Sequence, residues 1–243
     1  MIQPQIYLYT KFIGIPQTQA AYPVKEKGFF EYYDEYIHSL FNEQRIESRL
    51  FYFKQLTLPT VLNQTYQNFQ WIIFISHLLP TKYKEFIKSI SDKISVIEID
   101  NYRISNEELI QLHTPKEYNY ISSRLDDDDG LCLDYFELLL EKYSTKNLLI
   151  GSRDVVVVTY DGNNFLYSKR TRSFLVSSGF SCKNRHVYSI GGHANAQNIF
   201  SYDILSKKYP SIQSGGDHTF TKRDHVSKDV KIFTLQNYMD NIL

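Results

Sequence analysis

Short apolar runs alternate with longer amphipathic segments along the first half of the chain. Residues 6–9 predict a first strand. Residues 71–76 predict a further strand; they are apolar from Trp71 to Ile75, which is typical of a strand buried on both faces of a parallel sheet. Between them, residues 47–64 repeat their apolar positions at helical spacing and predict a helix. Pro59 lies inside this segment, so we expect a kink or a break there.

The same alternation continues as far as residue 143. Pro80 begins a predicted helix that runs to residue 88, since proline suits the first helical turn, and residues 94–99 predict the next strand. Ser105 is a helix cap followed by acidic residues. Residues 118–122 predict a fourth strand, and residues 133–143 predict the helix after it. This order predicts a three-layer α/β domain with mostly parallel strands.

The second half of the chain has a different character. The sequence Asp-Gly-Asn at 161–163 separates two strand-like runs, residues 155–160 and 164–169, and predicts an antiparallel hairpin. Residues 194–205 have helical character. We therefore expect one domain over residues 1–243, with a parallel nucleotide-binding half (1–150) followed by a more antiparallel half (151–243).

Charge and cysteine content narrow the function classes. The chain carries 27 basic and 27 acidic residues, so it lacks the basic excess typical of nucleic-acid binders, and we expect no nucleic-acid partner. Cys132 and Cys182 are too few for a disulfide framework and suit a reducing compartment. No secretory signal is visible, and the longest apolar run, residues 71–75, is too short to span a bilayer. These features predict a cytoplasmic protein without a transmembrane segment, and they leave peripheral membrane contact open.

The densest charge in the chain is the run of four aspartates at 126–129. It follows the predicted strand 118–122, and ligands of open α/β sheets bind beyond the carboxyl ends of the strands. Adjacent carboxylates repel one another unless water or a cation compensates them. The run is therefore either a solvated loop before the next helix or a metal site, and its position at a strand end favours the metal site.

Alternate residues of an extended segment point the same way, so Asp126 and Asp128 can share one divalent cation. Magnesium or manganese held by one or two carboxylates completes its shell with water and substrate phosphates. Such an ion can neutralise a departing phosphate. Arg124, two positions before the run, either reaches the diphosphate or offsets the local negative charge.

These residues resemble a known family. Residues 122–131, SSRLDDDDGL, resemble the "TRLDDDDAL" segment of a group of rhamnosyltransferases, which are family-2-like glycosyltransferases with the GT-A fold. The stretch from Arg49 to Trp71 is similar to that group's "R-F-x-F…L-P-S-L-x-x-Q-T…F-x-W" pattern. Thr10-Lys11-Phe12 is similar to its N-terminal "T-R-F", with lysine in place of arginine. The matches lie in the predicted first half of the chain.

The resemblance implies a GT-A fold of three α/β/α layers, whose sheet is mostly parallel with a smaller antiparallel part. It also implies a nucleotide-sugar donor and a divalent metal, Mn²⁺ or Mg²⁺, bound through an Asp-x-Asp motif at Asp126 and Asp128. The resemblance also implies that Thr10 lies near the base or the ribose of the donor. We expect the donor-binding residues to be Thr10, Lys11, Arg124 and Asp126.

A further partial match lies near the end of the chain. Residues 216–223 resemble the "G-E-D-x-x-L-x-x-R" segment of inverting family-2 enzymes, with Gly216 in place of glutamate. The match implies that Asp217 is the general base for the acceptor hydroxyl. From the residues alone, Asp217 is equally a cap of a short helix. His218 is a candidate third metal ligand or phosphate contact, and His193 is the alternate.

The leading hypothesis is a metal-dependent glycosyltransferase that moves a hexose, rhamnose among the candidates, from a nucleotide-diphosphate donor to an acceptor hydroxyl. The acceptor is a glycan, a lipid-linked molecule or another hydroxyl compound, and polysaccharide or glycan synthesis is one such role. Nucleotidyltransferases and phosphohydrolases also place paired carboxylates on a metal, so they form a second enzyme class. A third interpretation is a non-catalytic binding protein with a GT-A-like domain.

Overall fold

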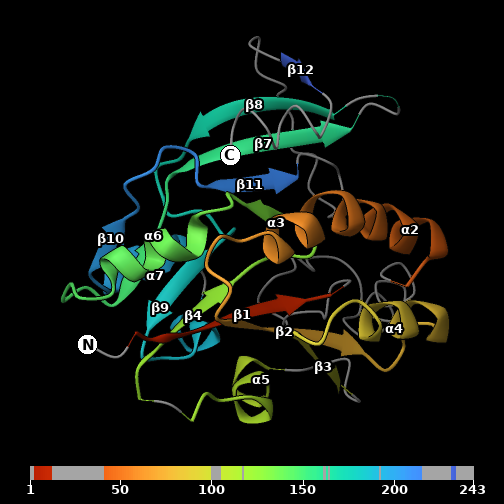
Figure 1. Cartoon of the computed structure of the whole chain (residues 1–243), viewed down its shortest axis with the longest axis horizontal. Coiled ribbons are helices and arrows are strands. Elements are labelled where there is room, and N and C mark those ends of the chain that lie inside the picture. Colours follow the sequence, from red (N-terminus) through yellow and green to blue (C-terminus); the bar gives the residue numbers. More distant parts are fainter. Residues whose placement is uncertain are drawn as a thin grey trace, which may run out of the picture.

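A computed structural model describes residues 3–12, 41–99, 105–116, 118–160, 163, 165–191, 193–214 and 231–233, with the backbone alone for 193–195, 214 and 231–233. A seven-stranded sheet in the order β10-β6-β9-β4-β1-β2-β3 lies at the centre (Figure 1). Its strands are β1 (Gln5–Lys11), β2 (Phe69–Ser76), β3 (Ile94–Ile99), β4 (Tyr120–Arg124), β6 (Leu149–Gly151), β9 (Phe180–Lys183) and β10 (Tyr202–Ile204).

This first sheet is mostly parallel. The strand β1 pairs in parallel with both β2 and β4, β2 pairs in parallel with β3, and β10 pairs in parallel with β6. Only β9 is inserted antiparallel, between β4 and β6. The carboxyl ends of β1 and β4 therefore lie side by side at one edge, where the chain leaves each strand.

Both faces of the sheet are buried, and the strand sequences show why. Along β1, Ile6 and Leu8 belong to one hydrophobic cluster, whereas Tyr7 and Tyr9 belong to another on the opposite face. The first cluster is covered by α2 (Glu43–Tyr52), α4 (Thr81–Lys88) and α6 (Tyr135–Lys142). The second is covered by α5 (Asn106–Leu112), the 3₁₀ turn η3 (Val187–Ile190) and α7 (His193–Ile199). The result is the expected three-layer arrangement.

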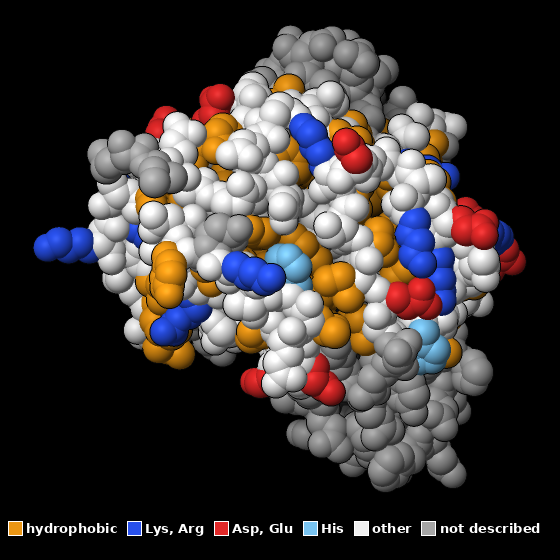
Figure 2. All heavy atoms as spheres, turned by 60° about the horizontal axis from the view of Figure 1, so that its bottom comes forward, with side chains coloured by type: hydrophobic (Ala, Val, Ile, Leu, Met, Phe, Trp, Pro, Cys, Tyr) orange, Lys and Arg blue, Asp and Glu red, His pale blue; other side chains and the backbone are white. Residues whose placement is uncertain are grey.

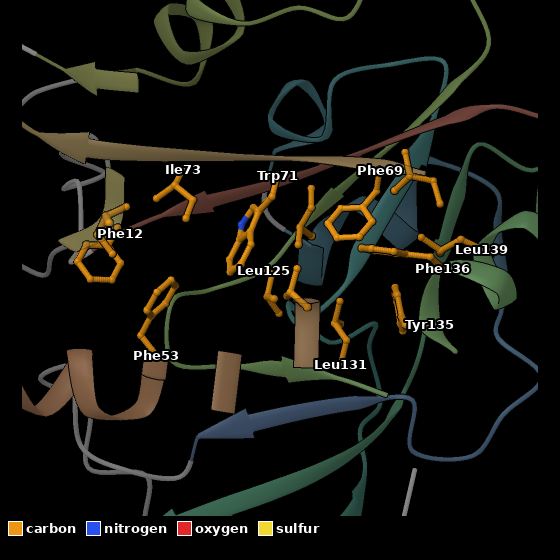
Figure 3. Packing of buried hydrophobic residues seen from close by; sticks show 14 of the residues in the cluster. Phe12, Phe53, Phe69, Trp71, Ile73, Leu125, Leu131, Tyr135, Phe136 and Leu139 are labelled. Atoms are coloured by element: carbon orange, nitrogen blue, oxygen red, sulfur yellow. The ribbon is translucent and has the colours of Figure 1, made fainter. Parts of the chain in front are cut away.

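Large aromatic side chains fill the first cluster (Figure 3). Trp71, the only tryptophan of the chain, has no exposed surface. Its ring lies 5.8 Å from that of Phe53, which in turn lies 5.0 Å from Phe12. Leu125 and Leu131 pack into the same cluster from the residues on either side of the acidic run, so this core lies directly under the run.

The predicted helix over residues 47–64 is a continuous but irregular helical segment. It consists of α2, a π-helical turn η2 (Phe53–Thr57) and α3 (Leu58–Leu62). Asn42 caps its start by accepting a hydrogen bond from the backbone of Gln44 at 3.0 Å. The expected disturbance at Pro59 takes the form of the π turn, in which the Leu58 N–H donates to the Phe53 carbonyl. Proline has no N–H to donate, so a break in the bonding pattern just before it has a clear cause.

A second sheet, in the order β12-β8-β7-β11-β5, packs above the helical segment (Figure 1). Its strands are β5 (Gly130–Leu131), β7 (Asp154–Tyr160), β8 (Phe165–Thr171), β11 (Ser211–Ser214) and β12 (Lys231–Phe233). The antiparallel pairing of β7 with β8 confirms the predicted hairpin. The strands β7 and β11 pair in parallel, and the other pairings in this sheet are antiparallel.

The fold class predicted from the sequence is confirmed, with one wrong element. The strand 94–99 is found as predicted, and Ser105 forms a full capping box with Glu108. The helix predicted over 194–205 ends at Ile199, because residues 202–204 pair instead with β6 at the edge of the first sheet. The strands β9 and β10 come from the predicted second half, so the first sheet combines both halves. The division of roles at residue 150 stays a prediction.

Figure 2 shows the face of the molecule on the side of α5 and β3. Lysine and arginine side chains lie interspersed with acidic ones there, and hydrophobic side chains lie between them. Leu112 at the end of α5 is 48% exposed and Tyr118 is 94% exposed. Among the described residues, no helix has both the length and the apolar character that a membrane crossing requires. Both cysteines are buried free thiols, and burial raises the pKa of each.

Candidate active site at the carboxyl ends of β1 and β4

The acidic run lies at the strand end where the sequence placed it, and both of its ends are fixed. The strand β4 ends at Arg124, and the Leu125 N–H donates to the Tyr9 carbonyl at 3.0 Å. The run then turns back on itself, with the Asp129 N–H donating to the Asp126 carbonyl at 3.1 Å. At Gly130 the chain enters the second sheet as β5. The run is therefore a short, anchored connection between the two sheets.

The four carboxylates have very different surroundings. Asp127 has no exposed surface, and Asp128 and Asp129 are 9% and 4% exposed. Asp126 is the most accessible, with 37% of its side chain exposed. A solvated loop would leave all four exposed, so this burial does not fit that interpretation.

Arg49 of α2 compensates the most buried of these charges. Its Nε lies 3.2 Å from Oδ2 of Asp127, and its Nη2 also donates to Oδ1 of that carboxylate. The same Nη2 lies 3.2 Å from Oδ1 of Asp128. Burial opposes the positive charge of Arg49, but the two carboxylates outweigh it and raise its pKa. The guanidinium thus forms a fork-like pair with Asp127 and bridges to Asp128.

Arg124 forms an ion pair with Asp126 at the exposed end of the run. Its Nη2 lies 3.2 Å from Oδ1 of Asp126, and this neighbour, ahead of the opposing effect of burial, raises the pKa of the guanidinium. At the other end, the Ser178 hydroxyl donates to Oδ2 of Asp129. Arg124 therefore does offset negative charge locally. A contact with a donor diphosphate stays a prediction.

Lys11, the last residue of β1, brings a second cation to this edge of the sheet. Its Nζ lies 3.4 Å from Oδ1 of Asn106 and 4.5 Å from the centroid of the Tyr188 ring. Burial and, less strongly, the charge of Arg124 lower the pKa of Lys11 to about 7, against the opposing effect of Asp126. Two cations and one accessible carboxylate thus lie together where β1 and β4 end.

Thr10 has a structural partner. Its side chain is fully buried, and its hydroxyl accepts a hydrogen bond from Nε1 of Trp71 at 3.0 Å. Thr10 thus points to the face of the sheet opposite to that of Tyr9, as alternation along a strand requires. Its predicted role near the base or the ribose of the donor stays a prediction, and no surface of its side chain is accessible in this arrangement.

Aromatic and histidine side chains pack together next to Lys11, whose Nζ lies over the ring of one of them, Tyr188. The Tyr9 hydroxyl lies 3.0 Å from Nδ1 of His113, and the ring of Tyr9 lies 4.4 Å from that of His186. Nδ1 of His186 accepts the Tyr188 N–H at 3.2 Å. Burial and the charge of His113 lower the pKa of His186 to about 4, so its ring is neutral at neutral pH. His186 therefore adds no positive charge beside Lys11.

Other predicted site residues lie outside this description. Asp217 and His218 are not among the described residues, and His193 is described by its backbone alone. Conversely, sequence reasoning assigned no role to Arg49, although it was part of the matched stretch. The signal that could have indicated its role is that Arg49 lies on the side of the helix that otherwise buries apolar side chains, where an arginine needs a charged partner.

For metal binding, the described residues of the site can be judged only by the kinds of donor atom that they offer. No group of three histidine, cysteine, aspartate or glutamate side chains among the described residues is placed to hold a metal ion. Asp126 and Asp128 supply hard oxygen donors from one short segment. They fit the binding mode in which one or two carboxylates hold the ion and substrate phosphates and water complete its shell. Metal ligation by these residues stays a prediction.

One comparison with a solved structure, that of TarS, agrees with the architecture. The structure is similar to residues 1–349 of TarS from S. aureus, crystallised in complex with UDP, with a TM-score of 0.50 at 8% identity over 87% of this chain and 60% of that one. HddC from Yersinia pseudotuberculosis matches with a TM-score of 0.42 at 11% identity, over 86% of this chain and 93% of that one. At such identities the TarS likeness shows the fold alone. The chain spans only about 60% of that TarS fragment.

Sequence comparison supplies the family. No curated protein matches this chain. One family model, described as "Putative rhamnosyl transferase", matches residues 22–232 and so includes both the acidic run and the segment that carries Arg49. Because this match covers most of the chain, the protein belongs to that rhamnosyl transferase family of glycosyltransferases.

Proposed function

We propose that this protein transfers a sugar from a nucleoside-diphosphate donor to an acceptor hydroxyl, with Mn²⁺ or Mg²⁺ as its cofactor. The observation that carries the proposal is the meeting of Lys11 and Arg124 beside Asp126 at the ends of β1 and β4. Burial and the charge of Arg124 lower the pKa of Lys11, and Asp126 offsets this only in part, so a further anion beside Lys11 and Arg124 would be stabilised by both side chains. A donor diphosphate at the carboxyl ends of the strands would supply that anion.

The roles of these residues follow from where charge develops in the reaction. When the sugar leaves its donor, negative charge appears on the diphosphate, and Lys11 and Arg124 would stabilise it from fixed positions. Asp126 and Asp128 would hold the cation, which adds its own charge to the stabilisation of the leaving diphosphate. Asp126 is the more accessible of the two carboxylates, and Asp128 is held by Arg49.

The acceptor side is proposed from the sequence. Asp217 would accept the proton of the acceptor hydroxyl, and His218 would be a third metal ligand or phosphate contact. The family description suggests rhamnose as the first donor sugar to test, and the UDP complex of TarS suggests uridine nucleotides among the first bases. The acceptor would be a glycan, a lipid-linked molecule or another hydroxyl compound, and we propose a cytoplasmic location.

The test has two steps. A thermal-shift screen of nucleotide sugars with and without Mn²⁺ identifies the donor. Hydrolysis of that donor is then measured for wild type and for the double variant Asp126→Ala/Asp128→Ala. A matched control, Asp92→Ala/Glu137→Ala, removes two carboxylates that are exposed outside the acidic run. Activity that survives in the first double variant at the level of the control would refute the proposed roles of Asp126 and Asp128.

The products separate the competing functions. A glycosyltransferase releases a nucleoside diphosphate, whereas a nucleotidyltransferase releases pyrophosphate. A non-catalytic binding protein would show a thermal shift with a nucleotide sugar but no turnover with any donor. Release of pyrophosphate, or binding without turnover, would overturn the transferase proposal in favour of the corresponding alternative.

A further inference from the structure

The helical segment 43–62 turns polar side chains toward the acidic run, although the core lies beside it. The hydroxyl of Thr57, in the π turn, donates to the Asp127 carbonyl at 3.1 Å. One turn later, Oγ1 of Thr60 accepts the N–H of Leu131 at 3.3 Å. Both threonines are fully buried. Each contact therefore satisfies a polar group in the interior and fixes the backbone at or just beyond the run.

Gln64 continues the same row just after α3. Its Nε2 donates to the Cys132 carbonyl at 2.6 Å, and its Oε1 accepts the N–H of Phe136 at 3.2 Å. Gln64 is 1% exposed, so these bonds lie in the interior. We call Arg49, Thr57, Thr60 and Gln64 the polar clamp. Its members follow the order of their partners along the chain, from the acidic run to the start of α6.

Arg49 is the charged member of the clamp and the one that reaches carboxylates. It is 6% exposed, and the carboxylate of Asp127 is its closest partner. A buried ion pair is a weak source of net stability, because desolvation cancels most of the Coulomb attraction. An apolar pair of similar size would support the fold about as well. The geometry gives the pair another use, because the same guanidinium also lies 3.2 Å from Asp128.

We propose that Arg49 is a positioning residue for the acidic run. It holds Asp128 in the orientation in which that carboxylate meets the donor-bound cation, and Asp127 is the counter-charge that keeps Arg49 in place. This inference rests on the proposed function, since it concerns the residues that would hold the cation. Outer partners of this kind set the direction of a ligand and typically change metal affinity by ~10–100-fold when they are removed.

The experiment uses a charge-neutral change. Arg49→Met alone would leave Asp127 buried without its partner, so the informative variant is Arg49→Met/Asp127→Asn, which removes one charge of each sign. Arg49→Lys is the conservative variant, because it keeps the charge but loses the planar fork that can reach two carboxylates. Lys54→Met is the matched control, since Lys54 is an exposed cation of the same helical segment.

Two quantities are measured for each protein. Thermal unfolding reports the fold, and electron paramagnetic resonance titration reports Mn²⁺ affinity in the presence of UDP and, separately, of GDP. We expect the paired variant to fold cooperatively and to bind Mn²⁺ with nucleoside diphosphate ~10–100-fold more weakly than wild type. Arg49→Lys should be closer to wild type in melting temperature than in Mn²⁺ affinity. Lys54→Met should match wild type in both.

Each outcome leads to a distinct conclusion. A folded paired variant with wild-type Mn²⁺ affinity would show that Arg49 is only structural and would overturn the inference while leaving the proposed function intact. The inference would also be overturned if Arg49→Lys stayed as close to wild type in Mn²⁺ affinity as in melting temperature. If wild type itself binds no Mn²⁺ with either nucleotide, the metal-dependent function fails together with the inference. If the paired variant does not fold, the Mn²⁺ affinities of Arg49→Lys and Lys54→Met are compared instead. Weaker binding by Arg49→Lys supports the inference, and equal binding overturns it.

Discussion

The isosteric change Asp127→Asn should cost the fold several kcal/mol. It removes the carboxylate that is bonded to Nε and Nη2 of Arg49, and it leaves a guanidinium that is 6% exposed. Breaking a buried ion pair from one side typically destabilises a protein by ~3–5 kcal/mol. Asp128 still lies 3.2 Å from Nη2 and compensates part of the charge, so we expect a loss at the lower end of that range, ~3 kcal/mol.

That loss is large compared with the ~5–15 kcal/mol by which native proteins are stable. For a chain of this size it corresponds to a fall in melting temperature of ~6–12 °C, at ~2–4 °C for each kcal/mol. Urea unfolding followed by the fluorescence of Trp71 measures it directly, because this single tryptophan is fully buried in the core under the acidic run. The midpoint should fall without a change in slope.

Asp126→Asn is the matched control. Its side chain is 37% exposed and its pair with Arg124 borders solvent, so the same chemical change there should cost less than ~1 kcal/mol. A loss below ~1 kcal/mol for Asp127→Asn, equal to that of the control, would refute the view that the Arg49 pair is a buried and mutually dependent unit. So would full additivity of Arg49→Met and Asp127→Asn in the double variant.

Three further predictions concern the neighbouring residues. Burial, together with the charge of Arg124, lowers the pKa of Lys11 from 10.5 to about 7, so the unfolded chain binds more protons than the folded one between these pH values, and stability should rise with pH through that window. Affinity for UDP, measured by calorimetry, should fall over the same window in wild type but not in Lys11→Met. Parallel affinity profiles of the two proteins would contradict this prediction. Thr10→Val leaves the indole N–H of Trp71 unpaired and should cost ~1–3 kcal/mol in urea unfolding, and an unchanged UDP affinity would speak for a structural role whereas a large loss would restore the predicted donor contact. Gly179→Ala should lower the yield of folded protein or its melting temperature markedly, because the residue has a φ of 76° and the new Cβ would overlap the hydroxyl of the fully buried Tyr135, and a wild-type melting curve would refute this.

Much of the fold could be predicted because its signals are local. The apolar run of β2 and the cap at Ser105 are readable from a few adjacent residues, and both are confirmed. The helix predicted over 194–205 failed because the pairing of β10 with β6 is decided by distant residues. Helical spacing within one segment carries no information about such a partner.

The candidate site divides in the same way. The acidic run was readable because four aspartates follow a strand, and its position between the two sheets agrees with that prediction. The role of Arg49 was not, because its partners Asp127 and Asp128 lie more than seventy positions away and only the folded chain brings them together. The burial of Thr10 likewise depends on which face of β1 meets Trp71.

The acidic run also constrains how this chain can vary. Leu125 alone separates it from the last residue of β4, and the first residue of β5 follows it directly; each of those strands is paired within a different sheet. One added or deleted residue would have to shift a strand register or expel Leu125 or Leu131 from the core. The two strands that the run joins therefore constrain its length, in addition to the roles of its side chains. Insertions that alter acceptor choice would have to arise in other connections.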